Sequence, residues 1–256
     1  MTKILITNDD GIHSPGLVTL ARELKSVAPV VAVVPDREQS AIGTALTLHQ
    51  LLRARRARHI LPDVETFAVD GTPGDSVILA IDNLFRGEIG LVISGINQGL
   101  NLGDDVLISG TVGAALQGYL RGLPAIAVST DAPDGDLLVK TARLTALLAK
   151  RLLNGSLPAN AFLNVNLPAT PSTGEVVITR LAHGTHIDTV DEGHDSKGAH
   201  YRLVRHRVDS EVDDDTDVWA VRRGKISITP LHVYLTTQPS TACLDGLCAD
   251  LSRELA

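Results

Sequence analysis

Short runs of aliphatic and β-branched residues alternate, over the first two thirds of the chain, with stretches whose apolar residues recur at helical spacing. The short runs predict strands at Lys3–Thr7, Pro29–Val34, Glu65–Val69, Leu91–Ser94, Ala125–Ser129 and Phe162–Leu167. The amphipathic stretches predict helices at Gly16–Val27, Pro73–Leu84, Gly110–Leu120 and Leu137–Leu153. Strands without polar alternation are typical of a parallel sheet buried on both faces. The pattern therefore predicts an α/β fold, a mostly parallel sheet covered by helices.

The pattern changes after about Leu167. Residues 170–224 combine proline, glycine, an acidic run and five of the nine histidines. The segment KISITPLHVYLTT that follows predicts a strand with alternating burial. We therefore expect an α/β core over residues 1–168 that carries the active site. Residues 169–256 are expected to form a β-rich extension with a terminal helix, used for oligomer contacts.

Composition narrows the classes of function. The chain has 256 residues, 44% of them hydrophobic, which is enough for a full core. A net charge of −7 argues against a general affinity for nucleic acid polymers or anionic membranes. The two cysteines, Cys243 and Cys248, are too few for a disulfide framework. With neither a signal-peptide pattern nor a spanning apolar run, we expect a cytoplasmic protein.

Two adjacent carboxylates, Asp9 and Asp10, directly follow the first predicted strand in the sequence NDDG. Such neighbours repel each other and lose hydration, so they need a cation or hydrogen bonds as compensation. Oxygen ligands of this kind suit Mg²⁺ or Mn²⁺. The alternative is that one aspartate caps the next helix while Gly11 makes the turn.

Polar loops also follow two later strands. In PDREQS, Ser40 offers a hydroxyl oxygen to a metal, and Arg37 or Glu38 offers ion pairs that support the loop. In SGINQGLNLGD, glycines let the backbone approach a ligand while Asn97 and Asn101 reach inward. A polar surface turn and a tight turn held by asparagines are the respective alternatives. Neither the dinucleotide-binding motif nor the P-loop motif occurs.

The segment SGTVGAA opens a predicted helix with Ser109, Gly110 and Thr111. Unpaired N–H groups and the helix dipole favour an anion there, and phosphate is the natural one. An ordinary Ser or Thr N-cap is the alternative. All of these polar segments lie at or near the carboxyl ends of predicted parallel strands, so one crevice could collect them.

Six stretches match a known family in its own order, from residue 4 to about residue 231. They are ILITNDDG, VVPDREQSAIGTALTL, VDGTPGDSVILAI, LVISGINQGLNLGDDVLISGTVGAALQG, FLNVNLP and ISITPL. The chain thereby resembles the SurE (survival protein E) family of metal-dependent nucleotidases. The resemblance implies a Rossmann-like core with a C-terminal extension exchanged between subunits of homodimers or homotetramers. It also implies hydrolysis of nucleoside 5′- and 3′-monophosphates, and of short polyphosphate in some members.

The resemblance implies roles for the residues that the polar segments had already selected. It places the ligands of one divalent cation, Mg²⁺ or Mn²⁺, at Asp9, Asp10, Ser40 and Asn97. It places phosphate-binding residues at Asn101, Ser109, Gly110 and Thr111. In the resulting hypothesis, Asp9 and Asp10 carry catalysis by holding the cation. The other residues hold phosphate oxygens as charge develops.

The chain departs from the family pattern away from these ligands, at Thr44, Gly74, Ser76, Ile108 and Tyr234. These departures bear on base preference, contacts at the rim of the pocket and subunit packing. A non-catalytic nucleotide-binding sensor is the alternative function, and the intact aspartate pair favours the enzyme. A phosphoacceptor domain would need an aspartate where Ser94 ends its strand. A haloacid-type phosphatase would need Asp-x-Asp instead of NDD.

Four weaker signals have structural explanations. The histidines at 183, 186, 194, 200 and 206 are expected in a solvated loop rather than a zinc site. The run from Asp209 to Asp217 is expected to be an exposed acidic turn. The arginines at 53, 55, 56 and 58 indicate a solvated strand end or an oligomer contact more than a polyanion site. Trp219 is equally consistent with an interface and with base stacking.

Overall fold

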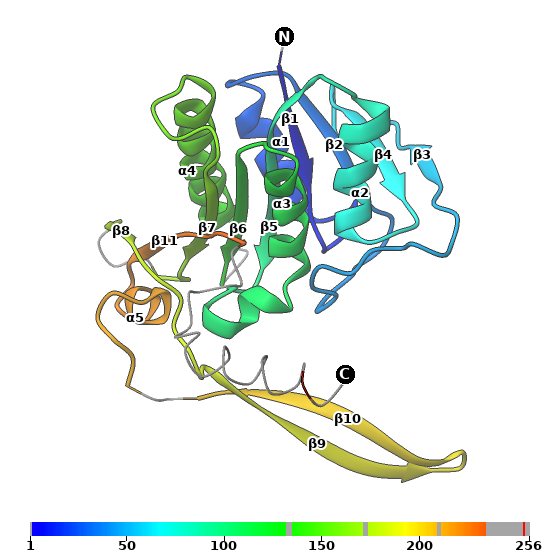
Figure 1. Ribbon diagram of the computed structural model, residues 1–256, viewed down its shortest axis with the longest axis vertical. Helices are drawn as coiled ribbons and strands as arrows, with labels where there is room; N and C mark the ends of the chain where they lie inside the picture. Colours follow the sequence, from blue (N-terminus) through cyan, green and yellow to red (C-terminus); the bar gives the residue numbers. More distant parts are fainter. Residues whose placement is uncertain (1, 132–134, 171–173, 209–210, 234–252, 254–256) are drawn as a thin grey trace.

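A single mixed sheet forms the centre of the computed structural model, which describes residues 2–131, 135–170, 174–208, 211–233 and 253. The first strands of that sheet are β1 (Lys3–Thr7), β2 (Val30–Pro35), β3 (Ala54–Arg56), β4 (Glu65–Val69) and β5 (Ile89–Gln98). The later ones are β6 (Ala125–Thr130), β7 (Phe162–Leu167), β8 (Val176–Ile178) and β11 (Ile226–Pro230). Their order is β3-β4-β2-β1-β5-β6-β7-β11-β8, and all neighbours from β4 to β7 are parallel (Figure 1).

All six predicted strands are present, and three of them, β1, β4 and β7, have the predicted bounds. The largest difference is at β5, which was expected to end at Ser94 and continues to Gln98. The register shifts after Ser94, and pairing with β6 resumes at Asn97, opposite Ser129. Gly95 permits this shift because its φ of +133° is closed to most L residues. The polar SGINQ segment is thereby held on the sheet, where a free loop was expected.

Helices cover both faces of the sheet, which confirms the predicted three-layer α/β fold. The helices α1 (Pro15–Leu24) and α4 (Gly135–Leu153) pack on one face, and α2 (Pro73–Leu79) and α3 (Gly110–Leu120) pack on the other. Side chains of β1 alternate between the two faces: Ile4 and Ile6 join the core under α1, whereas Leu5 joins the core under α2. The predicted helix 73–84 is α2 followed by a π-helical turn at Ala80–Leu84.

The chain beyond residue 168 contributes in three ways. Strand β11 pairs antiparallel with β7 and parallel with β8, so both extend the main sheet. Strands β9 (His186–Asp195) and β10 (Gly198–Arg207) form a long antiparallel hairpin that projects from the body (Figure 1). A short helix, α5 (Asp217–Arg222), packs near β11. A division at residue 168 stays a prediction, and the expected terminal helix, Tyr234 and both cysteines lie outside the described residues.

Three expectations for this region are wrong in part. The histidine segment is a regular hairpin, not a loop, because the two strands pair along their whole length. Strand β11 is buried at four consecutive positions, without alternation, because it lies between β7 and β8. Asp213, Asp214 and Asp215 are exposed as expected, but Asp217 is fully buried. Its carboxylate accepts hydrogen bonds from backbone N–H groups, which a sequence pattern does not reveal.

The arginine cluster and Trp219 both lie near the surface of the molecule. Arg55 and Arg56 are exposed on β3 at the edge of the sheet, which confirms the solvated strand end. Trp219 is half-buried, with the charged ends of Arg223 and Lys225 about 5 Å from its ring centre. Among the described helices, none is both long enough and apolar enough to cross a membrane.

Candidate functional site

A cavity of about 500 Å³ opens at the carboxyl ends of β1 and β5. The strand order reverses at this point, since β2 and β4 lie beyond β1 while β6 and β7 lie beyond β5. Open parallel sheets bind their ligands at such switch points. Six of the eight predicted site residues line the cavity: Asp9, Asp10, Ser40, Asn97, Asn101 and Ser109. The other lining residues are His13, Ser14, Pro15, Glu38, Ala41, Gln98, Asp105 and Ile108.

Asp9 and Asp10 follow β1 on a turn that directs the chain toward α1. Gly11 makes the turn with a φ of +86°, and Asn8 Nδ2 donates a hydrogen bond of 2.9 Å to the Gly11 carbonyl. The N-cap of α1 is Ser14, so the alternative that an aspartate caps this helix is wrong. The Asp9 carbonyl accepts a hydrogen bond of 2.7 Å from Gln39 N, which ties the loop after β2 to the cavity.

The environment of the two carboxylates disfavours their charged forms. Burial raises the pKa of Asp9, against the opposing hydrogen bond from Thr111. Burial and, next, the neighbouring charge of Asp9 raise the pKa of Asp10 to about 6. Both shifts have the causes expected for paired acids withdrawn from water. A cation between the two would remove this cost, because its charge favours both ionised forms.

The neutral oxygens next to the aspartates fit a hard divalent cation. Ser40 is exposed, and its hydroxyl donates a hydrogen bond of 2.6 Å to Glu38 Oε1. Asn97 donates from Nδ2 to the Gly99 carbonyl at 2.7 Å, which leaves its amide oxygen as an available ligand. The described residues include no group of three or more His, Cys, Asp or Glu side chains placed to hold a metal. A cation here would therefore use hydroxyl and amide oxygens beside the two carboxylates.

The N-terminus of α3 meets Asp9 from the other side of the cavity. Ser109 is the N-cap, and its hydroxyl accepts from Val112 N at 3.1 Å. Gly110 packs so closely that a Cβ there would lie 2.9 Å from Asp9 Oδ2. Thr111 is fully buried and donates its hydroxyl hydrogen to Asp9 Oδ1. Gly110 and Thr111 thus shape the surroundings of Asp9 and are not among the lining residues, and their contact with phosphate stays a prediction.

The match to known proteins agrees with this geometry. Residues 4–188 match the family model described as Survival protein SurE. The chain belongs to the SurE family. Proteins named 5′-nucleotidase SurE are similar to it over nearly its whole length. The one from Dehalococcoides mccartyi strain CBDB1 is 49% identical, with 97% of this chain and 96% of the relative covered.

Two further comparisons extend the likeness to other bacteria and to a solved structure. The 5′-nucleotidase SurE of Moorella thermoacetica is 44% identical, with 91% of each chain covered. The crystal structure of the SurE protein from Aquifex aeolicus aligns with a TM-score of 0.80 at 34% identity. That alignment covers 96% of this chain and 99% of the other. The expected SurE family and Rossmann-like α/β fold are both confirmed.

In this SurE chain, Asn101 is held by residues that the sequence did not single out. Asn166 Oδ1 accepts from Asn101 N at 2.9 Å, and Asn166 Nδ2 donates to the Asn101 carbonyl at 3.0 Å. Asn164 Nδ2 donates to the same carbonyl at 2.8 Å. Asn101 Nδ2 donates to Ser129 Oγ at 2.8 Å, which leaves its second amide hydrogen for a ligand. The signal was present in FLNVNLP, where two asparagines occupy alternate positions of a strand without charged residues.

The chain also places Asp105 on the cavity wall, inside a stretch that the sequence had selected for its asparagines and hydroxyls. Asp105 belongs to a 3-10 helix, Gly103–Leu107, which connects Asn101 to Ser109. Ile108, one of the positions where the chain departs from the family pattern, lines the cavity and is partly exposed at its rim.

Proposed function

We propose that this SurE protein is a 5′-nucleotidase that hydrolyses nucleoside 5′-monophosphates to nucleoside and phosphate with the help of a divalent cation. The observation that carries the proposal is one cavity at the switch point that combines the Asp9–Asp10 pair with the N-terminus of α3. Its relatives carry the name 5′-nucleotidase over almost the same length. We further propose activity on 3′-monophosphates and on short polyphosphate, because the cavity is open and polar around the phosphoryl position.

The cation of this proposal is Mg²⁺ or Mn²⁺, held by Asp9, Asp10, Ser40 and Asn97. The raised pKa values of the aspartates and the free amide oxygen of Asn97 support this set of ligands. When bound, a divalent cation neutralises phosphoryl charge and acidifies water. Asp9 is oriented for this task by the hydrogen bond from Thr111, and Gly110, which has no Cβ, lets its carboxylate lie close to the first turn of α3.

The other residues bind and orient the phosphate. N–H groups in the first turn of α3 point toward the cavity end of the helix, where the dipole favours an anion. Ser109 keeps that helix start in place by capping it, and Asn101 lines the same cavity with one amide hydrogen that Ser129 does not use. Phosphoryl transfer depends mainly on such positioning and charge neutralisation. The rigid support of Asn101 by two buried asparagines is what this chemistry requires.

Phosphate release from a panel of nucleoside 5′- and 3′-monophosphates and a short polyphosphate tests the proposal. We expect release with Mg²⁺ or Mn²⁺, loss with EDTA, and a decrease of at least about 100-fold in Asp9→Asn, by analogy with loss of other charge-stabilising groups. Asp63→Asn is the matched control, since Asp63 lies on the surface, away from the cavity, and forms an ion pair with Lys25. A cation-dependent rise in melting temperature, absent from Asp9→Asn, reports binding separately from turnover. Full turnover in Asp9→Asn would exclude the assigned role, and tight nucleotide binding without release would favour the sensor.

We also propose a cytoplasmic homodimer or homotetramer in which the β9–β10 hairpin takes part. Val190 and Leu203 lie directly opposite each other on one face of the hairpin, with Tyr201 beside them. Their exposed fractions are 59%, 80% and 66%. An isolated two-stranded hairpin is at best marginally stable in water, so these side chains are expected to be covered by a second copy of the chain.

A further inference from the structure

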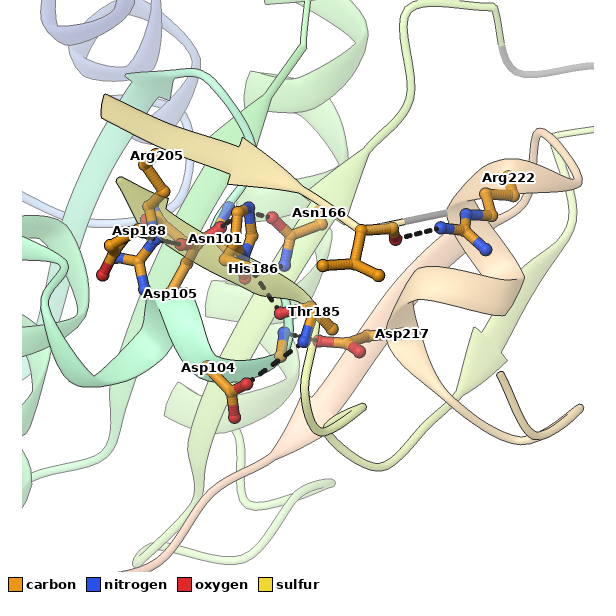
Figure 2. A network of polar contacts seen from close by, with 12 residues as sticks. Asn101, Asp104, Asp105, Asn166, Thr185, His186, Asp188, Arg205, Asp217 and Arg222 are labelled. Carbon is orange, nitrogen blue, oxygen red and sulfur yellow. Dashed lines mark hydrogen bonds and ion pairs between the residues drawn. The ribbon is translucent and has the colours of Figure 1, made fainter. Parts of the chain in front are cut away.

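The base of the β9–β10 hairpin lies against the 3-10 helix Gly103–Leu107, which carries Asp105 on the cavity wall (Figure 2). Each oxygen of the Asp105 carboxylate faces a basic side chain of the hairpin. His186 Nε2, on β9, is 3.4 Å from Oδ2, and Arg205 Nε, on β10, is 3.5 Å from Oδ1. One acidic residue of the site is therefore held by two strands that were expected to serve only the assembly.

The two basic side chains are themselves fixed in place. His186 is almost fully buried, and its Nδ1 makes a hydrogen bond of 3.0 Å with Thr185 Oγ1. Arg205 Nε also lies 3.4 Å from Asp188 Oδ1, and these two residues are paired directly across the hairpin. The contact with Asp188 thus fixes the direction in which the Arg205 side chain extends toward Asp105. The contact is part of the fold and does not depend on a freely moving surface side chain.

The contacted segment controls both ends of the phosphate site. Asn101 precedes Gly103–Leu107 and Ser109 follows it, so a displacement of Asp105 moves both. The backbone helps to transmit that displacement, since Ile108 N donates to the Asp105 carbonyl at 3.1 Å. A second contact from the same region, Thr185 N to Asp104 Oδ2 at 3.2 Å, holds the neighbouring residue (Figure 2).

The charge of Asp105 presents a problem for an enzyme that binds a phosphate. The cavity wall already contains Asp9, Asp10 and Glu38, and the substrate brings further negative charge. Burial raises the pKa of Asp105, and the charges of His186 and Arg205 act against that shift. Without these two partners, an ionised Asp105 would repel the phosphate and would be free to rotate into the cavity.

We propose that Arg205 and His186 are positioning residues of the phosphate site: Arg205 neutralises Asp105, and both hold the segment between Asn101 and Ser109. The inference deepens the proposed nucleotidase function and rests on it. It makes the hairpin a structural part of each active site, in addition to its contact with a second copy. It also predicts that a variant without Arg205 binds phosphate less well because the Asp105 carboxylate is left charged and unpaired, and not because of the volume of the Asp105 side chain.

The test compares Arg205→Gln with the double variant Asp105→Asn/Arg205→Gln. We expect Arg205→Gln to raise KM for a nucleoside 5′-monophosphate about tenfold, and the inhibition constant of inorganic phosphate by a similar factor, with less than about a threefold change in kcat. Removing the unpaired charge in the double variant should return KM to within about threefold of the wild type. Arg205→Lys, which retains the charge, should have a small effect. Asp105→Asn alone completes a double-mutant cycle, which isolates the interaction between the two neighbours.

Arg202→Gln is the matched control, because Arg202 is exposed on the same strand and pairs across the hairpin with Asp191 on the opposite face. Its KM should equal that of the wild type. An unchanged KM in Arg205→Gln would overturn the inference. A raised KM that stays raised in the double variant Asp105→Asn/Arg205→Gln would also overturn it, since that result indicates damage to the hairpin alone. Calorimetric binding of inorganic phosphate separates this inference from the proposed function. If the wild-type protein binds phosphate but releases none from nucleotides, the proposed nucleotidase function is contradicted. If wild type and Arg205→Gln bind phosphate with equal affinity, the positioning role is contradicted.

Discussion

The buried carboxylate of Asp217 provides the sharpest test of how the C-terminal region supports the site. It lies at the start of α5 and is inaccessible to water. Its Oδ2 accepts from Gly103 N at 2.8 Å, and its Oδ1 accepts from Ala182 N at 3.0 Å and from Val218 N at 2.8 Å. Replacing Asp217 with alanine removes the partner of two backbone donors from distant parts of the chain.

The magnitude follows from those two donors. A buried N–H that loses its partner costs roughly 1–3 kcal/mol, so Gly103 and Ala182 together lose about 2–6 kcal/mol. Part of this loss is offset, because burial raises the pKa of Asp217 and its replacement removes a charge that is costly to bury. We therefore expect Asp217→Ala to lower the free energy of unfolding by about 3 kcal/mol. Gly103 begins the segment that carries Asp105, so kcat/KM should decrease as well.

Urea denaturation at one fixed protein concentration measures this effect. With an m-value of about 3 kcal/mol per molar for a chain of this size, the midpoint should fall by about 1 M. Asp215→Ala is the matched control, since Asp215 belongs to the same acidic run but is exposed and pairs with Arg180 on the surface. Its midpoint should stay at the wild-type value. Equal midpoints for the two variants would refute the argument that Asp217 holds Gly103 and Ala182.

Two further substitutions test packing at the site and at the hairpin. Gly110→Ala places a Cβ 2.9 Å from Asp9 Cβ, and a displacement of a catalytic group by such a contact should lower kcat/KM about 100-fold in phosphate-release assays. Gly135→Ala, where a Cβ meets open space, should leave kcat/KM unchanged, and equal rates in both variants would contradict the role of this close approach. Leu203→Glu should shift the assembly toward smaller species in sedimentation velocity, because it places a charge in the exposed apolar face of the hairpin. Leu147→Glu, at a leucine that is also exposed but lies on α4, is the control, and an unchanged sedimentation coefficient in Leu203→Glu would contradict a hairpin interface.

The sheet and the positions of the candidate ligands could be predicted because both depend on local pattern. Buried parallel strands leave continuous apolar runs, and polar residues directly after such runs gather at one edge of the sheet. Asp9 and Asn97 line the same cavity in this way although they are far apart in the sequence. The end of β5 was predicted less well, since its last residues depend on pairing with β6 after a register shift at Gly95.

The supporting residues could not be predicted, because their roles depend on contacts between distant segments. Asp217 follows Asp213, Asp214 and Asp215 in an acidic run, and these three are exposed, whereas its own partner Gly103 is 114 positions away. His186 and Arg205 occur in a segment of mixed polarity that gave no indication of a regular hairpin. Asn166 is an exception, since a polar residue within an otherwise apolar strand is itself a signal.

The supporting contacts have a common arrangement that explains why so much of the chain is needed for one small cavity. Leu102 anchors the segment from Asn101 to Ser109 in a small apolar cluster with Ala182 and Val218. Polar contacts hold it further, among them those of Asn166 at Asn101, of Asp217 at Gly103 and of the hairpin at Asp105. If the segment were held at one point only, the residues between its ends could adopt several conformations. Phosphoryl transfer depends on the placement of several donors at once, so a segment that supplies two of them must be fixed along its length. The described residues beyond β7 therefore contribute to the site through the backbone segment that they hold.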